Sequence, residues 1–388
     1  MSTSPIWSHD SSPDEVESRP ELDAHLATGS LRDLTIQGLR LDVDPPDLSA
    51  VDLTDTLFVG CRFTSVDAEA DLVRRGAHVV PAFDGVPYPT APNRLYTPED
   101  LAAGFAEGGF AGMYDTVVYQ HFCTHGGALP DIREALTERL HDSGIDDALA
   151  DAMSAWVAAR GASTVVGVMG GHAEVRGSVA YRLAATLAWR LGQAGRLVVT
   201  GGGPGVMEAA NLGAYLAGHS AENLTDVIDH LAKVPDYHDH DPYTAAALAV
   251  RSEYQVRPEL ARGGLSIPTW LYGHEPANLF AGGIAKYFSN AIREDTILRL
   301  ARGGIVFAPG RAGTVQEVFQ AATKAFYVTD GASGPFVFLG SAFWAGLPAP
   351  ELLRTLLAAS PHGDLSGLVH VTDELDDALA LLTTAGGA

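Results

Sequence analysis

The segment Gly304-Ile-Val-Phe-Ala-Pro-Gly-Arg-Ala-Gly-Thr-Val-Gln-Glu317 combines a strand, a tight turn and the start of a helix. Its first four residues form the short apolar run of a buried strand, and Ala312 to Tyr327 have helical periodicity. Pro309 to Gly313 therefore form the turn between them. Backbone N–H groups at a helix start lack partners within the helix and lie at the positive end of its dipole, so this turn predicts a phosphate site.

Two further residues of this segment add chemistry to the turn. Thr314 lies in the first turn of the helix and offers a hydroxyl donor, and Glu317 follows on the same side of the helix. A carboxylate repels phosphate, but it can hold the diol of a sugar or activate a water molecule. Phosphate at one end and a carboxylate beside the sugar describe a nucleotide ligand.

The sequence from 161 to 388 alternates strands with helices. We expect strands at 164–169, 197–200, 265–271, 336–339 and 368–371, and helices at 178–191, 206–217, 283–302, 350–359 and from 373. This alternation predicts an α/β fold with a Rossmann-like parallel sheet flanked by helices. In such folds ligands bind at the carboxyl ends of the strands.

Two glycine-rich turns follow the first two of these strands. Gly170 and Gly171 end one strand, and Gly201-Gly-Gly-Pro-Gly205 ends the next. Because the carboxyl ends of parallel strands meet at one edge of a sheet, both turns should adjoin the Pro309 turn and bind phosphate or ribose. The predicted binding residues are Gly170, Gly171, Gly201, Gly202, Gly203, Gly205, Pro309, Gly310, Arg311, Gly313 and Thr314.

The motif Pro309-Gly-x-x-Gly-Thr-x-x-Glu317 resembles the Pro-Gly-Gly-x-Gly-Thr-x-x-Glu signature of the LOG (Lonely Guy) family, with Arg311 at the second Gly. The resemblance covers about residues 160 to 345. The segments that agree in order and spacing are Val165-Val-Gly-Val-Met-Gly-Gly171, Thr200-Gly-Gly-Gly-Pro-Gly-Val-Met-Glu208 and Ile292-Arg-Glu-Asp-Thr-Ile-Leu-Arg299. His274-Glu-Pro-Ala-Asn278 is similar to a Glu-Pro-Pro-Asn segment of the larger bacterial nucleotide 5′-monophosphate nucleosidases in that family.

The resemblance implies a phosphoribohydrolase, which cleaves the N-glycosidic bond of a nucleoside 5′-monophosphate to free base and ribose 5-phosphate. Glu317 and Arg293 would be its catalytic residues. Glu317 would grip the ribose, stabilise the developing positive charge and activate water, while Arg293 would position the nucleotide and offset charge on the leaving base. No metal or cofactor is required, and a homodimer or larger homo-oligomer is implied. Arg311 either adds a phosphate contact or marks a changed substrate.

Other functions share parts of this pattern. A non-catalytic nucleotide-binding or sensing protein would keep the site, although a pure binder has no need of both Glu317 and Arg293. Lysine decarboxylase, an older label for this family, needs pyridoxal phosphate on a lysine, and Lys233, Lys286 and Lys324 all lie outside the glycine-rich turns. Residues 201–205 also lack the Gly-x-Gly-x-x-Gly spacing of NAD-binding turns.

The N-terminal part of the chain has a different composition. Residues 1–24 are rich in Ser, Pro, Asp and Glu and predict a disordered tail. Residues 25–160 predict a separate α+β module of unknown role, with helices at 130–141 and 146–159. Leu48, Leu53, Phe58 and Phe63 have the five-residue period of a pentapeptide β-solenoid, but four matches are few, so an irregular β-rich module is favoured.

Composition restricts the partners. The 388 residues are 46% hydrophobic, enough for two domains and a large core. A formal charge of −23 argues against nucleic-acid partners, which need a basic surface. No apolar run is long enough to span a membrane, and the two cysteines offer neither a disulfide framework nor metal-ligand spacing. We therefore expect a cytoplasmic protein with a small-molecule partner and no membrane partner.

Two further groups of side chains are weaker candidates. Asp236-Tyr-His-Asp-His-Asp241 contains metal-ligand residue types, but a solvated loop is favoured because consecutive positions do not converge on one ion. Tyr272, His274 and Phe280 follow a predicted strand and could stack on a base, although aromatic residues there are as often part of the core.

Overall fold

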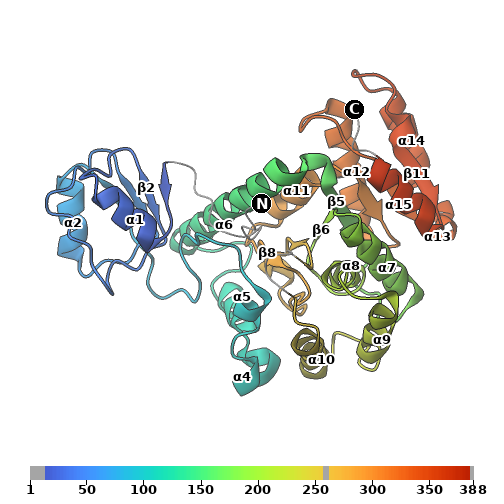
Figure 1. Cartoon of the computed structure of the whole chain (residues 1–388), viewed down its shortest axis with the longest axis horizontal. Helices are drawn as coiled ribbons and strands as arrows, with labels where there is room; N and C mark the ends of the chain where they lie inside the picture. The colour runs from blue at the N-terminus through green and yellow to red at the C-terminus, as the bar shows by residue number, and fades with distance from the viewer. Residues whose placement is uncertain (1–13, 257–261, 385–388) are drawn as a thin grey trace.

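The structure is a computed structural model that describes residues 14–256 and 262–384. Its strands form two parallel sheets, one of seven strands and one of four. Helices flank the larger sheet on both faces (Figure 1). The predicted α/β fold with a Rossmann-like parallel sheet is confirmed.

The larger sheet has the order β11-β10-β9-β5-β6-β7-β8. The chain runs outward from β5 to β8 and then returns to place β9 on the other side of β5, so the strand order reverses between β5 and β9. A ligand crevice is expected outside the carboxyl ends of the strands at such a reversal. The strands are β5 (Val165–Met169), β6 (Leu197–Thr200), β7 (Leu265–Ser266), β8 (Gly283–Ile284), β9 (Ile305–Phe307), β10 (Phe336–Leu339) and β11 (Val369–Thr372).

Alternate residues of the central strands face two different hydrophobic cores. In β5, Val165 and Met169 face one core, and Val166 and Val168 face the other. The first core contains residues of α6 (Ile132–Arg160), α11 (Asn290–Leu300), α12 (Ala312–Tyr327) and α14 (Ala349–Ala358). The second contains residues of α7 (Val179–Gln193), α8 (Val206–Tyr215), α9 (Ala221–Leu231), α10 (His240–Glu253) and α15 (Leu375–Thr384).

Most elements predicted in this half are confirmed within a few residues, and two are corrected. The strand predicted at 265–271 ends at Ser266, because Thr269 caps a short 3₁₀ helix, Trp270–Tyr272. The helix predicted at 283–302 begins only at Asn290, where Ser289 caps α11. Gly283–Ile284 pairs instead with β7 as the edge strand β8.

The smaller sheet belongs to a short β-solenoid and not to the favoured irregular module. Its strands β1 (Glu15–Val16), β2 (Thr35–Gln37), β3 (Leu57–Val59) and β4 (His78–Val80) stack in parallel, with offsets of 20 to 22 residues between paired positions. Residues five apart, such as Leu31, Ile36 and Leu41, are buried inside the coil. Helix α2 (Val66–Arg74) lies between β3 and β4.

The predicted disordered tail is too long. Residues 1–13 lie outside the described part of the chain, but Glu15–Val16 pairs with β2, and α1 (Arg19–Leu26) follows. Ser18 and Glu21 form a capping box at the start of α1, and Leu22 is fully buried. Burial of a few apolar side chains such as Leu22 in the solenoid core therefore orders this segment, although its composition is mainly polar.

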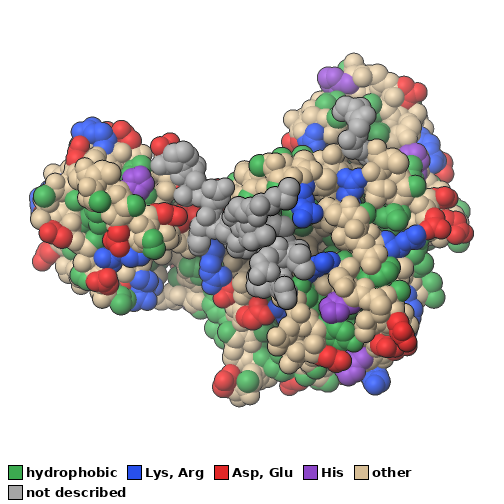
Figure 2. All heavy atoms as spheres, viewed as in Figure 1, with side chains coloured by type: hydrophobic (Ala, Val, Ile, Leu, Met, Phe, Trp, Pro, Cys, Tyr) green, Lys and Arg blue, Asp and Glu red, His purple; other side chains and the backbone are tan. Residues whose placement is uncertain are grey.

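The boundary between the two units lies near residue 80 and not near 160. Figures 1 and 2 show the solenoid as a lobe beside the main body. Residues 88–160 contribute instead to the first core of the larger sheet, through α3 (Pro98–Ala102), α5 (Tyr114–Thr124) and α6. The two helices predicted at 130–141 and 146–159 are one continuous helix, α6.

The charged side chains are distributed over the surface as expected from the acidic composition. Figure 2 shows acidic side chains over both the lobe and the main body, with basic side chains scattered among them. Within the described residues, no helix is long and apolar enough to cross a membrane.

We expect Gly144→Ala to destabilise the fold by about 1–3 kcal/mol, because overpacking forces backbone to shift. A methyl group at Gly144, inside α6, would lie 2.5 Å from the carbonyl oxygen of Pro92. Gly108→Ala in α4 (Phe105–Gly112) is the matched control, since open space surrounds that position. Chemical denaturation measures both. Equal stabilities for the two variants would contradict the packing of residues 81–97 against α6.

Candidate functional site

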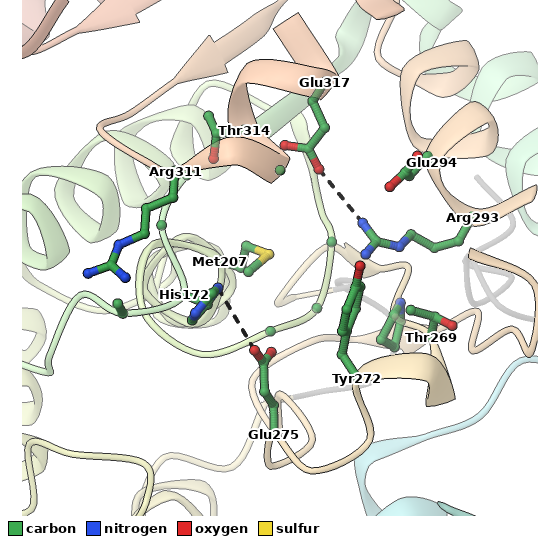
Figure 3. Close-up of a pocket in the computed structure, with 18 of the residues that line it drawn as sticks. His172, Met207, Thr269, Tyr272, Glu275, Arg293, Glu294, Arg311, Thr314 and Glu317 are labelled. Carbon is green, nitrogen blue, oxygen red and sulfur yellow. Dashed lines mark ion pairs between the residues drawn. The ribbon is translucent and has the colours of Figure 1, made fainter. Parts of the chain in front are cut away.

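A cavity of about 390 Å³ lies at the carboxyl ends of the central strands, where the strand order reverses (Figure 3). Residues of the turns after β5, β6 and β9, of helices α8, α11 and α12 and of the segments after β7 and β8 line it. From the prediction, the lining includes Gly170, Gly171, Gly201, Gly202, Gly203, Arg293, Arg311, Gly313, Thr314 and Glu317. The additional lining residues are His172, Ala173, Met207, Pro268, Thr269, Tyr272, His274, Glu275, Pro276, Ala277, Lys286, Glu294 and Gln316.

Gly205, Pro309 and Gly310 support the cavity from behind and do not line it. The N–H of Gly171 donates to the carbonyl of Pro309 at 3.0 Å, and a side chain on Gly205 would meet the carbonyl of Gly171 at 2.5 Å. A side chain on Gly310 would lie 2.1 Å from the Thr314 hydroxyl. Close packing of the turns accounts for these three residues in the structure, and their binding role stays a prediction.

The glycine turn after β6 must stay free of side chains. Gly202 has a φ of +74°, and a Cβ there would lie 2.2 Å from the Ser266 hydroxyl. A Cβ on Gly203 would lie 2.9 Å from a carboxylate oxygen of Glu275. Backbone is therefore the wall of the cavity at this turn, which lets a ligand approach the amides at the start of α8.

Glu317 and Arg293 meet at the cavity from neighbouring helices. Glu317 extends from the second turn of α12 and Arg293 from the first turn of α11, with 3.7 Å between Oε1 and Nη1 (Figure 3). Their side chains are only 14% and 10% exposed. Within residues 14–256 and 262–384, the buried Nε of Arg293 has no hydrogen-bond partner. The guanidinium therefore has donor capacity left for a ligand.

Burial raises the pKa of Glu317 to about 7. Arg293 partly offsets this effect because its positive charge favours the carboxylate, and Glu294 acts in the opposite direction. Desolvation disfavours the charged form of a carboxyl group more than one neighbouring cation stabilises it here. A carboxyl with a pKa near 7 can exchange a proton with water at neutral pH, as a general base must.

Arg311 and His172 add to the cavity near the start of α12. Arg311 directly precedes α12, next to Gly313 and Thr314. Burial lowers the pKa of His172, and the positive charge of Arg311 lowers it further. His172 therefore favours its neutral form, while Arg311 is the permanent charge available to a phosphate at the helix start.

The loop after Trp270–Tyr272 supplies residues that were not predicted as site residues. Glu275 extends from it, with its carboxylate 3.9 Å from Nδ1 of His172 (Figure 3). Burial raises the pKa of Glu275. The resemblance at residues 274–278 and the position of His172 after a glycine turn were the available signals. Of the three aromatic candidates, Tyr272 and His274 line the cavity, whereas Phe280 is fully buried in the core.

Glu208, part of the second glycine motif, belongs to the scaffold. Its carboxylate accepts two hydrogen bonds from Arg176, at 2.9 and 2.5 Å, and others from Tyr181 and Tyr243. This buried network links α8 to α7 and α10. Because every partner lies within the protein, Glu208 holds the start of α8 in place beside the cavity.

The acidic and His-rich run 236–241 lies at the start of α10, where Nδ1 of His238 is 2.6 Å from a carboxylate oxygen of Asp236. Both side chains are largely exposed, as the predicted solvated loop requires. Across the part of the chain that the structure describes, no group of three His, Cys, Asp or Glu side chains is placed to hold a metal ion.

We expect Glu317→Gln to stabilise the folded protein at high pH. The pKa of Glu317 is about 7 in the folded protein, whereas the ordinary pKa of a glutamate, expected in the unfolded chain, is 4.5. The contribution of this pKa difference to the free energy of unfolding is fully present below pH 4.5 and is lost as the pH rises through 7. The variant should match the wild type near pH 4 and exceed it by up to about 3 kcal/mol at pH 8, measured as the free energy of unfolding.

Glu351→Gln, which removes an exposed carboxylate on α14, is the control. A difference between Glu317→Gln and the wild type that stays constant from pH 4 to pH 8 would contradict the raised pKa.

Comparison of the chain with protein-family models and with curated proteins gave no match. The resemblance to the LOG family therefore stays a prediction from the motifs, and the function is argued from the geometry of the cavity.

Proposed function

We propose that this protein hydrolyses the N-glycosidic bond of nucleoside 5′-monophosphates, releasing the free base and ribose 5-phosphate. The observation that carries the proposal is the Glu317–Arg293 pair in a cavity that is also lined by two glycine turns and the start of α12. The resemblance of residues 309–317 to the LOG signature supports the same reaction. The implied homo-oligomer is part of this proposal.

The phosphate would bind at the start of α12. Gly313 and Thr314 line the cavity there, and Arg311 adds a permanent positive charge. Helix N-termini and arginine both favour a phosphate dianion. Glu317 lies one turn further along the same helix, so a 5′-phosphate at the helix start would leave the ribose beside its carboxylate.

In the hydrolytic step, the Glu317 carboxylate takes a proton from a water molecule. The water oxygen forms a bond to C1′ as the C1′–N bond breaks, and the base leaves with the bonding electron pair. Positive charge on the ribosyl group is stabilised by the nearby carboxylate. The leaving base takes up a proton from solvent, and Glu317 returns its proton to solvent.

Arg293 has two tasks in this scheme. Its ion pair with Glu317 keeps a fraction of the carboxyl ionised despite burial, since the cation lowers a pKa that desolvation raises. Its free Nε–H and the rest of the guanidinium can also offset negative charge on the departing base. Loss of Arg293 should therefore lower the rate and raise the apparent pKa of the reaction.

We expect the purified protein to release free base from at least one nucleoside 5′-monophosphate, followed by chromatography. Glu317→Gln should lower kcat by about 10² to 10⁴, the usual contribution of a general base. The wild-type rate should rise with pH through an apparent pKa near 7, because the ionised carboxylate is the active form. Arg293→Met should shift that midpoint upward.

Glu351→Gln is again the control and should retain the wild-type rate, because it lies on the exposed face of α14. If nucleotides bind but none is cleaved, the protein is a nucleotide-binding or sensing protein and the hydrolase proposal fails.

Arg311→Gly restores the glycine of the LOG signature and separates the two interpretations of Arg311. If Arg311 contacts the phosphate, the variant should raise KM for the nucleotide about 10-fold or more at similar kcat, since a charge-assisted hydrogen bond is lost. Weak activity on the nucleoside without phosphate should not change. An unchanged KM for the nucleotide would instead assign Arg311 to a changed substrate.

A further inference from the structure

One buried amine in the cavity has no role in the proposed hydrolysis. Lys286 follows β8 and is 3% exposed, yet it is among the residues that line the cavity. Lysine is rarely buried unless its charge is compensated. Its partners should therefore show why the fold holds an ammonium group at this place.

The charge of Lys286 is compensated from a distant part of the chain. Nζ donates to a carboxylate oxygen of Asp115 at 2.6 Å, and the same oxygen accepts from the indole N–H of Trp270 at 2.9 Å. Nζ also lies 5.3 Å from the centre of the Trp270 ring. Asp115 belongs to α5, so a segment that was predicted to be part of a separate module supports one end of the cavity.

This end of the cavity lies away from the phosphate end. Tyr287, the next residue after Lys286, accepts from the N–H of Trp270 and forms a parallel bridge with Thr269. Figure 3 shows Thr269 beside Arg293, across the cavity from Arg311. A nucleotide with its phosphate at Arg311 and its ribose at Glu317 therefore directs its base toward Lys286.

An ammonium group has three N–H donors and no acceptor. Among the described residues, Asp115 accepts one of these donors by the hydrogen bond above. The others can be satisfied by an acceptor on the base, such as a ring carbonyl oxygen. A base with an amino group at the same position would place its N–H donors against those of Lys286. The buried ammonium would then lack an acceptor, so the cavity would bind such a base more weakly.

We propose that Lys286, held by Asp115, donates a hydrogen bond to a carbonyl oxygen of the base, so that the cavity selects oxo bases. Lys286 is then a specificity-determining residue and Asp115 a positioning residue. The inference rests on the proposed nucleotide function and names the substrate class for the same site.

The test compares inosine 5′-monophosphate with purine riboside 5′-monophosphate, which lacks the base oxygen and its adjacent proton. Binding is measured by calorimetry in the Glu317→Gln background, so the result does not depend on turnover. We expect a preference for the oxo nucleotide of about 10-fold or more. The double variant Asp115→Asn with Lys286→Met should reduce it to about 2-fold or less without leaving one buried charge unpaired.

Asp115→Asn alone, with Lys286 still present, should weaken the preference for the oxo nucleotide. If Asp115 served only folding, this preference would not change. Affinity for ribose 5-phosphate, which has no base, should be unchanged in every variant and shows that the cavity is intact. Lys324→Met is the matched control, because Lys324 forms ion pairs with Asp295 and Asp330 outside the cavity.

An equal affinity of the parent for the two nucleotides, or a preference that survives in the double variant, would overturn the inference. Its failure can be told apart from that of the hydrolase proposal. Selective binding without base release supports the role of Lys286 and rejects hydrolysis, whereas base release without selectivity does the reverse.

Discussion

The site depends on two hydrogen bonds made by one glycine. Gly171 donates to Pro309 at 3.0 Å, and its carbonyl accepts from the N–H of Val206 at 3.2 Å. These bonds join the turn after β5 to the turn after β9 and to the start of α8. Gly205 approaches the same carbonyl so closely that a Cβ would clash. Three turns are thereby held as one surface, beside which residues from the starts of α8 and α12 line one cavity.

Two buried glutamates near this surface have different surroundings. Glu208 is satisfied by Arg176 and two tyrosines and stabilises the scaffold. Glu317 lies 3.7 Å from Arg293, but burial raises its pKa to about 7, so it can exchange protons near neutral pH. In the proposed function the two carboxylates therefore differ in role: Glu208 holds the scaffold, and Glu317 acts on the substrate.

The helices between the solenoid and the larger sheet belong to the unit that forms the cavity. Helix α6 packs its buried residues in the first core, and α5 places Asp115 beneath the cavity. Within the described part of the chain, residues 16–79 form a lobe with a core of their own. Changes in α5 could therefore alter ligand preference through Lys286 without touching a ligand.

The sequence by itself determined the parallel α/β sheet and the glycine turns, because strand and helix periodicity and turn glycines are local signals. The pairing of Glu317 with Arg293 was implied by the resemblance to the LOG signature. The sequence left the solenoid as the less favoured alternative, and it did not reveal the boundary near residue 80 or the positions of Glu275 and Lys286 in the cavity. These depend on contacts between residues far apart in the chain, such as Asp115 with Lys286. Tertiary structure also decided that Gly205, Pro309 and Gly310 pack behind the cavity, since close approach of backbones cannot be distinguished from ligand binding by residue type alone.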